Sequence, residues 1–207
     1  MTREEMRIKR EIKKTIEKDF LKPISKKNGY KIISGVAYVV YGDWIYTINV
    51  FNTHEWIMMT INVKPIAIDN LFWKIFEIYE DASKRPFSFH VNAAFIPYSL
   101  QLEEWKVPVA TSEQVESVLD QAFIDANNKI SMYCEKIKTI QDFKELVLNE
   151  EHINYLNCIL CDIVLRDYKS ALNTTEEELS KNHSGGFVSI QGGDIYEYVI
   201  RYCKKQM

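Results

Sequence analysis

The sequence predicts an α+β fold: an antiparallel β-meander of four to five strands, with an N-terminal helix and a helical C-terminal half. Gly42-Asp43 separates two apolar runs as a two-residue turn, residues 44–64 then alternate with period two, and apolar residues beyond Pro108 recur at helical spacing. The 207 residues, 46% of them hydrophobic, are enough for one well-buried core. We therefore expect a single α+β domain over 1–207, sheet-rich at 28–108 and helical at 109–207.

The first element is predicted to be an amphipathic helix with one apolar stripe. Pro23 is expected to end or kink this helix, and Asn28-Gly29 to turn the chain toward the sheet. The apolar residues of the stripe recur every four positions: Ile8, Ile12, Ile16, Phe20 and Ile24.

The meander follows, with Gly42 in the first central position of its first hairpin turn. A second turn at Thr53-His54 separates WIYTINVFN from WIMMTINVK. If Asn52 pairs with Glu55, one face of the two strands becomes almost wholly apolar and the other mixed, and a slip of one residue would mix the two sets. The pairs on the predicted apolar face are Val50 with Ile57, Ile48 with Met59, Tyr46 with Ile61 and Trp44 with Val63.

A short helix is expected from about Asn70 to Tyr79, after Pro65. The chain then returns to period two, first at Phe87, Phe89 and Val91 and later from Ile96 to Leu102, which predicts further strand. Pro97 indicates an edge strand or a break between two strands, because proline lacks the N–H that a central strand needs.

The remainder is predicted to be helical. Thr111 with Gln114 is a candidate capping box for the first of these helices, and Thr139 is expected to open a short one ending near Leu148. A longer helix is expected from about Glu150 to Leu172. Two further caps complete the prediction: Thr174 with Glu177, and Asp194 with Glu197 for the last helix.

Composition sets limits on location and partners. No apolar run approaches the roughly 20 residues that cross a bilayer, and the start MTREEMRIKREIKK lacks the apolar segment of a secretory signal. We therefore expect a cytoplasmic protein with no membrane partner. Residues 1–31 hold 11 Lys/Arg against 5 Asp/Glu, whereas the remaining 176 residues hold 15 against 24. The basic segment is interpreted as a solvated helix face on an acidic body, with an anionic partner as the alternative.

The four cysteines are expected to be reduced and mostly buried. Cys158 and Cys161 form a C-x-x-C, but no second ligand pair lies nearby for zinc, and a redox pair belongs at a helix N-terminus rather than inside a helix. No metal site and no cofactor are predicted. Gly192-Gly193, before the last helix, is interpreted as a loop with a helix cap, with anion binding as the alternative.

The candidate binding residues lie on the predicted sheet. His90 and Asn92 alternate with Phe89 and Val91, and if the less apolar side of the sheet is concave they join Asn49 and Asn62 in a polar floor, where a histidine can act as a general base. The favoured interpretation is a solvent-facing sheet surface partly covered by a helix. The same mixed face carries Trp56, which either packs beneath a helix or forms an interaction surface. Thr47 and Thr60 complete the predicted polar floor.

A family resemblance accompanies these patterns. The leading helix ending in FLKP, then GYK, VAYVVYG, WIYTINVFN and MTINV in close succession, resembles the uncharacterised bacterial domain of unknown function 4304 over roughly residues 12–64. The resemblance implies an α+β fold with a meander sheet in a small bacterial cytosolic protein. It carries over no catalytic residues.

Three functions follow as hypotheses. The first is a non-catalytic bacterial cytosolic protein-binding domain, immunity-like or accessory, because no motif for chemistry accompanies the acidic body and the aromatic sheet face. The second is a small-molecule-binding protein or enzyme that uses a polar cleft on the sheet. The third, binding of nucleic acid through the basic first helix, is disfavoured because a charge run alone is weak evidence for binding. Neither a substrate nor an oligomeric state follows from the sequence.

Overall fold

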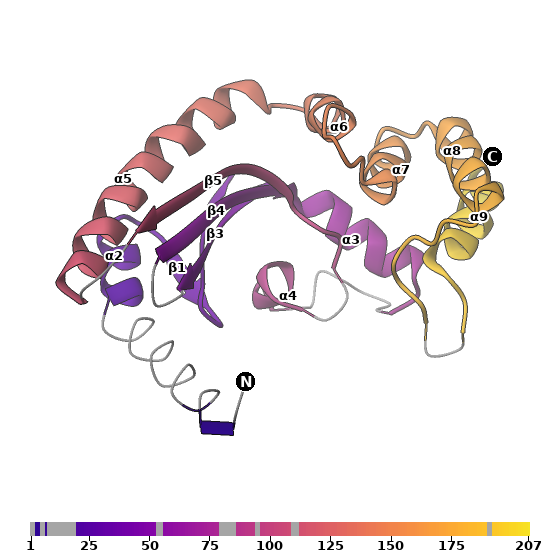
Figure 1. The fold of residues 1–207 in the computed structure, drawn as a ribbon. Coiled ribbons are helices and arrows are strands. Elements are labelled where there is room, and N and C mark those ends of the chain that lie inside the picture. Colours follow the sequence, from indigo (N-terminus) through magenta and orange to yellow (C-terminus); the bar gives the residue numbers. More distant parts are fainter. Residues whose placement is uncertain are drawn as a thin grey trace. The chain divides into compact units, whose positions relative to one another are not determined.

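A computed structural model describes residues 3, 4, 7, 20–52, 56–78, 86–93, 96–108, 112–189 and 192–207 (Figure 1). Its fold is α+β with a helical C-terminal half, as predicted, and of the described residues 54% are helical and 22% lie in strands. The chain divides into two compact units, one of residues 1–63 and 101–134 and the other of residues 64–100 and 135–207. The prediction of one domain stays a prediction.

The sheet is a five-stranded antiparallel meander in the order β1-β2-β3-β4-β5, which confirms the predicted strand number. Tyr41 pairs with Trp44 across the β2–β3 turn, and Gly42 has a φ of 58°, so the predicted two-residue turn is also confirmed. The strands are β1 (Lys31–Ile33), β2 (Val36–Tyr41), β3 (Trp44–Asn52), β4 (Trp56–Pro65) and β5 (Leu100–Pro108).

One face of β3 and β4 is apolar and buried, as their alternation predicts. Ile48 and Met59 are at most 1% exposed. Other residues predicted for this face are buried as well: Tyr46, Ile57, Ile61 and Val63. The β3–β4 turn at residues 53–55 lies outside the described residues, so the predicted pairing of Asn52 with Glu55 stays a prediction.

Two helices of the first unit pack beside this sheet: α2 (Lys22–Lys27) and α5 (Ser112–Lys136). Figure 1 shows α5 lying along the sheet. The Tyr30 ring meets Phe123 edge-on at 5.2 Å, and its hydroxyl donates to Asn127 Oδ1 over 2.7 Å. These contacts join the start of the meander to the middle of α5.

The first predicted helix is described only at its end, because its stripe from Ile8 to Ile16 lies outside the described residues. Helix α2 begins at Lys22 and runs to Lys27, and because residues 8–19 lie outside the described residues, the predicted end or kink of the leading helix at Pro23 stays a prediction. Pro23 lies in the first turn of α2, where a missing N–H leaves no hydrogen bond unmade.

The helices of the second unit come from two stretches of sequence. One stretch holds α3 (Ile66–Ile75) and α4 (Ser88–Val91), and the other holds α6 (Ile140–Leu148), α7 (Tyr155–Val164), α8 (Tyr168–Ser180) and α9 (Ile195–Gln206). The last four pack in sequence, and α3 packs on α7 and α9. Among the described residues, no helix has both the length and the apolar character needed to cross a bilayer.

Several predicted boundaries are corrected. The helix expected at Asn70–Tyr79 begins four residues earlier, directly after Pro65. The long helix expected from Glu150 to Leu172 is two helices, because the chain turns at Arg166 with a φ of 64° and Asp167 caps α8. Thr174 therefore lies inside α8 rather than at a cap.

Two predicted caps are confirmed. Thr139 forms a capping box with Asp142 at the start of α6, and the Asp194 carboxylate accepts from Tyr196 N at the start of α9. The side chain of Thr111, the other predicted cap, lies outside the described residues.

Candidate functional site

The predicted polar floor is divided between the two units. Asn49 and Asn62 lie in the first unit, and both donate to Thr60 Oγ1, over 3.4 Å and 3.1 Å. Thr60 and Asn62 are buried rather than open to solvent, and so is Thr47. Their polar groups thus take part in the packing of the sheet.

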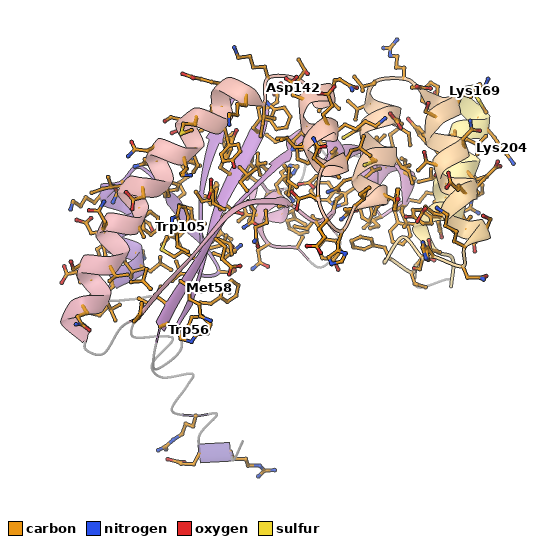
Figure 2. The ribbon with its side chains drawn as sticks, turned by 45° about the horizontal axis from the view of Figure 1, so that its top comes forward. Trp56, Met58, Trp105, Asp142, Lys169 and Lys204 are labelled. Carbon is orange, nitrogen blue, oxygen red and sulfur yellow. The ribbon has the colours of Figure 1, made fainter. Side chains whose placement is uncertain are left out.

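Trp56 lies near one end of β4 in the same unit and is half-buried. The Lys106 ammonium of β5 lies over its ring, 4.0 Å from the centroid, as a cation–π contact (Figure 2 labels Trp56). One face of this indole is therefore engaged within the protein.

His90 and Asn92 lie in the second unit, and the strand predicted for them is wrong. His90 belongs to the short helix α4, and Asn92 is the exposed residue that ends it. Tertiary contacts override the alternating pattern here, because the His90 ring packs against Trp73 with 4.9 Å between centroids and against Phe87 with 5.3 Å. The second predicted strand is confirmed only from Leu100 onward, as edge strand β5.

A buried ionic cluster involves His90 and two residues that the sequence analysis did not select, Lys64 and Asp69. The Lys64 ammonium lies 3.0 Å from Asp69 Oδ1 and 2.9 Å from Oδ2, and His90 Nδ1 lies 2.9 Å from Oδ2. The side chains of Lys64 and Asp69 are 2% and 0% exposed. A carboxylate only accepts hydrogen bonds, so His90 donates from Nδ1.

Burial lowers the pKa of Lys64, and the Asp69 charge opposes that shift. A lysine with a lowered pKa is a potential base or nucleophile. Here, however, the Lys64 ammonium and His90 Nδ1 both hydrogen-bond to the buried Asp69 carboxylate. We interpret the cluster as one that joins the last residues of β4 to α3 and α4 within the second unit.

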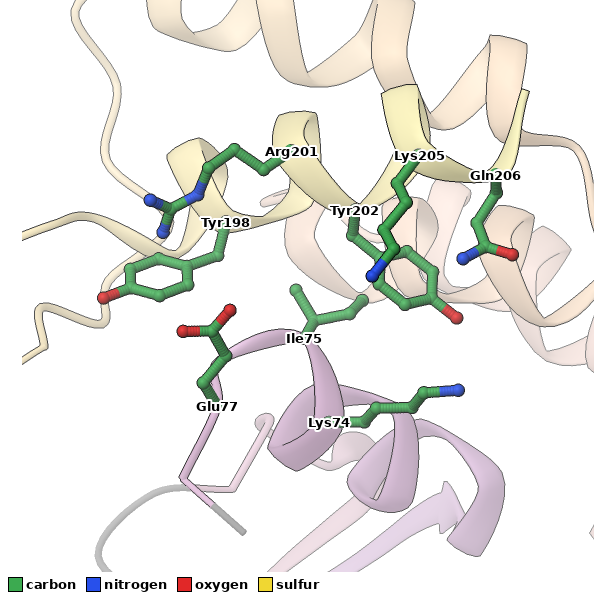
Figure 3. A pocket seen from close by; sticks show the side chains of 8 residues that line it. All are labelled: Lys74, Ile75, Glu77, Tyr198, Arg201, Tyr202, Lys205 and Gln206. Atoms are coloured by element: carbon green, nitrogen blue, oxygen red, sulfur yellow. The ribbon is translucent and has the colours of Figure 1, made fainter. Parts of the chain in front are cut away.

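A pocket of about 430 Å³ lies between α3 and α9 (Figure 3). This volume is within the range of small-molecule sites. Tyr198 is buried in its wall and Tyr202 half-buried, whereas the charged side chains that reach into it are exposed. The lining residues are Lys74, Ile75 and Glu77 from α3 and its end, and Tyr198, Arg201, Tyr202, Lys205 and Gln206 from α9.

The pocket is basic, with three cations against one carboxylate. Lys74 Nζ lies 5.7 Å from the centroid of the Tyr202 ring, and the Arg201 guanidinium lies 4.2 Å from that of Tyr198. Within the described part of the chain, neither these two cations nor Lys205 forms an ion pair with a carboxylate. The charges of Lys74 and Arg201 thus lie over aromatic rings. All three cations can make charge-assisted hydrogen bonds to an anion.

Glu77 stands at the end of α3 in a left-handed conformation, with a φ of 56°. Ile78 N donates to Trp73 O over 3.1 Å, which is the hydrogen bond of a Schellman motif at a helix C-terminus. In this motif the residue at the position of Glu77 is usually glycine. A residue with a Cβ costs roughly 1–2 kcal/mol in this conformation. Such strain is common at ligand sites, and here it places a carboxylate at the pocket.

The sequence contained a signal for this pocket that motif analysis did not use. Tyr198, Arg201, Tyr202 and Lys205 follow the spacing i, i+3, i+4, i+7, which puts them on one face of a helix. This helix face combines aromatic and cationic side chains, whereas the stripes predicted for the other helices are apolar. What the sequence lacks is any indication that α3 supplies the opposite wall.

The C-x-x-C cysteines are buried in α7, as expected, at 3% and 0% exposure. Burial raises the pKa of Cys158 from 9.0 to about 11 and also raises the pKa of Cys161. The Gly192-Gly193 loop precedes a helix N-terminus that Asp194 already occupies, since its carboxylate accepts from Tyr196 N and Gly185 N. Neither feature offers a reactive or anion-binding group.

The buried thiols predict a pH dependence. Burial raises the pKa of Cys203 from 9.0 to about 11, so between these values the folded protein holds a proton that the unfolded chain releases. This thiol therefore contributes less to stability as pH rises through that range. We expect the difference in free energy of unfolding between wild type and Cys203→Ala to fall from about pH 8 to about pH 10 in urea titrations. A constant difference would contradict this.

Comparison with known proteins finds no match among family models, curated proteins or solved structures. The resemblance to the domain of unknown function 4304 stays a prediction. The fold and the pocket define the class of the molecule as an α+β protein with a five-stranded meander and a basic, ligand-sized pocket in its helical unit.

Proposed function

We propose that this chain is a non-catalytic binding protein that takes a small anionic ligand in the α3–α9 pocket. The observation that carries the proposal is the set of three cations, Lys74, Arg201 and Lys205, around one concave site with no carboxylate paired to them among the described residues. Convergent cations of this kind make charge-assisted hydrogen bonds to anions.

The make-up of the pocket supports binding rather than chemistry. Its titratable groups are two ammonium groups, a guanidinium, two phenols and the Glu77 carboxylate. The histidine and lysine best suited to proton transfer, His90 and Lys64, are engaged with Asp69 in the buried cluster. The hypotheses of a partner protein on the aromatic sheet face, of a cleft on the sheet and of nucleic acid on the first helix stay predictions.

The proposal is tested by titrating the protein with inorganic phosphate and with citrate, as two simple anion probes, in an isothermal calorimeter at low ionic strength. We expect saturable binding of at least one of them. Lys205→Ala and Lys74→Ala should each weaken that binding roughly 10- to 100-fold, because a hydrogen bond to a charged group contributes about 1.5–3 kcal/mol.

Lys169→Ala is the matched control, because Lys169 is an exposed lysine of α8 in the same unit and lies outside the pocket (Figure 2). Its affinity for the same probe should equal that of wild type. Equal weakening by Lys169→Ala and Lys205→Ala would show only general charge attraction, and no binding of either anion would refute the proposal.

A further inference from the structure

The two ends of the α3–α9 pocket differ in charge. Figure 3 shows Lys74 and Lys205 around Tyr202 at one end, and Glu77 and Arg201 beside Tyr198 at the other. The first end carries two positive charges and no carboxylate. The second carries one charge of each sign. A ligand that complements both ends must therefore carry negative charge at one end and be close to neutral at the other.

We infer that the ligand is a phosphate monoester of a small polyhydroxylated molecule, that is, a sugar or polyol phosphate. This inference rests on the proposed function and names the chemical class that the pocket takes. The phosphate lies at the Lys74–Lys205 end, and the hydroxylated body lies between Glu77 and Arg201.

The charge at the first end matches a phosphate monoester. Such a group carries about −1.5 to −2 charges at pH 7 and three strong acceptor oxygens. The two ammonium groups come from different helices, Lys74 from α3 and Lys205 from α9, so they approach the pocket from both walls. A single carboxylate would neutralise only one of them.

The second end matches hydroxyl groups. The Glu77 carboxylate only accepts hydrogen bonds and the Arg201 guanidinium only donates them, so together they satisfy both roles of a hydroxyl. The same carboxylate repels a second phosphate, which disfavours sugar diphosphates and nucleoside di- and triphosphates. The Tyr198 hydroxyl donates to Ser189 Oγ over 3.0 Å and so holds its ring in place as the wall of this end.

The test compares inorganic phosphate, citrate, free glucose and three sugar or polyol phosphates (glycerol 3-phosphate, ribose 5-phosphate and glucose 6-phosphate) by calorimetry. At least one of the three phosphate esters should bind at least about tenfold more tightly than inorganic phosphate, and free glucose should not bind measurably. Glu77→Gln should remove most of that advantage and leave the affinity for inorganic phosphate unchanged or higher, because it deletes a negative charge without a change of shape.

Glu77→Gly provides a second variant that does not depend on the stability of Glu77→Gln. Glycine relieves the left-handed strain at this position, so this variant should melt at a higher temperature than wild type and still lose the preference for the ester. A folded variant that keeps the preference would show that Glu77 does not recognise the body of the ligand.

The outcomes separate this inference from the proposed function. If citrate binds in the pocket and no phosphate does, anion binding stands and the phosphate inference is overturned. If all three esters bind no more tightly than inorganic phosphate, or Glu77→Gln weakens both equally, the hydroxyl-binding end is overturned. If no anion binds, both proposals fall.

Discussion

Replacing Asp69 by asparagine is expected to lower the free energy of unfolding by about 3–5 kcal/mol. The substitution leaves the buried Lys64 ammonium and His90 imidazole around a side chain that no longer carries a negative charge. Lys64 and His90 both depend on the Asp69 carboxylate, and the Lys64 and Asp69 side chains are removed from solvent. A loss of this size is a large part of the stability of an ordinary domain. Urea denaturation followed by circular dichroism measures it.

The size of the effect should depend on pH in a way that identifies Lys64 as its cause. Burial already lowers the pKa of Lys64, and loss of the Asp69 charge lowers it further. Between the folded and the unfolded pKa the unfolded chain binds more protons, so stability rises with pH there. The deficit of Asp69→Asn relative to wild type should therefore be smaller at about pH 9 than at about pH 7.

Two controls test the charge argument. Lys64→Met combined with Asp69→Asn should recover at least half of the lost stability, because methionine fills similar volume without a charge. Glu176→Gln removes a carboxylate whose partner, Lys204, lies 3.8 Å away with both side chains exposed, and it should change stability by less than about 0.5 kcal/mol. If Asp69→Asn costs no more than Glu176→Gln, the cluster does not stabilise the fold.

Replacing Gly185 by alanine is expected to destabilise the protein by about 1–3 kcal/mol through overpacking. Gly185 has no positive φ, so its backbone would accept a side chain, but an added Cβ would overlap Ile195 Cγ2 and lie 3.1 Å from the Tyr196 ring. Both neighbours are buried at the start of α9. The loop cannot withdraw without loss of the 3.1 Å bond from Gly185 N to Asp194 Oδ1, whose carboxylate also caps α9.

A double-mutant cycle with Ile195→Ala tests this reason. Ile195→Ala alone creates a cavity, but it also makes room for the new methyl group, so Gly185→Ala should cost at least about 1 kcal/mol less in that background than in wild type. Chemical denaturation of the four proteins provides the comparison. Additive losses would mean that the two residues do not clash.

The local elements of the fold were predictable where a short-range signal decides them. The Gly42-Asp43 turn, the buried alternation of β3 and β4, and the caps at Thr139 and Asp194 all depend on residues within a few positions of one another. The prediction failed at α4, where the period-two pattern of FSFHV forms a helix. His90 is held there by Asp69, Trp73 and Phe87, and two of these three lie more than fifteen residues away in sequence.

By itself, then, the sequence determined an α+β protein with an antiparallel meander of four to five strands, because side-chain alternation and turn chemistry act within single strands and hairpins. Only the tertiary structure decided where its candidate site lies. The floor predicted from Asn49, Asn62, His90 and Asn92 is divided between two units, whereas Lys74 and Lys205, 131 positions apart, line one pocket. The physical reason is that a pocket requires two walls, and the pairing of α3 with α9 follows from packing of their buried faces rather than from any local pattern.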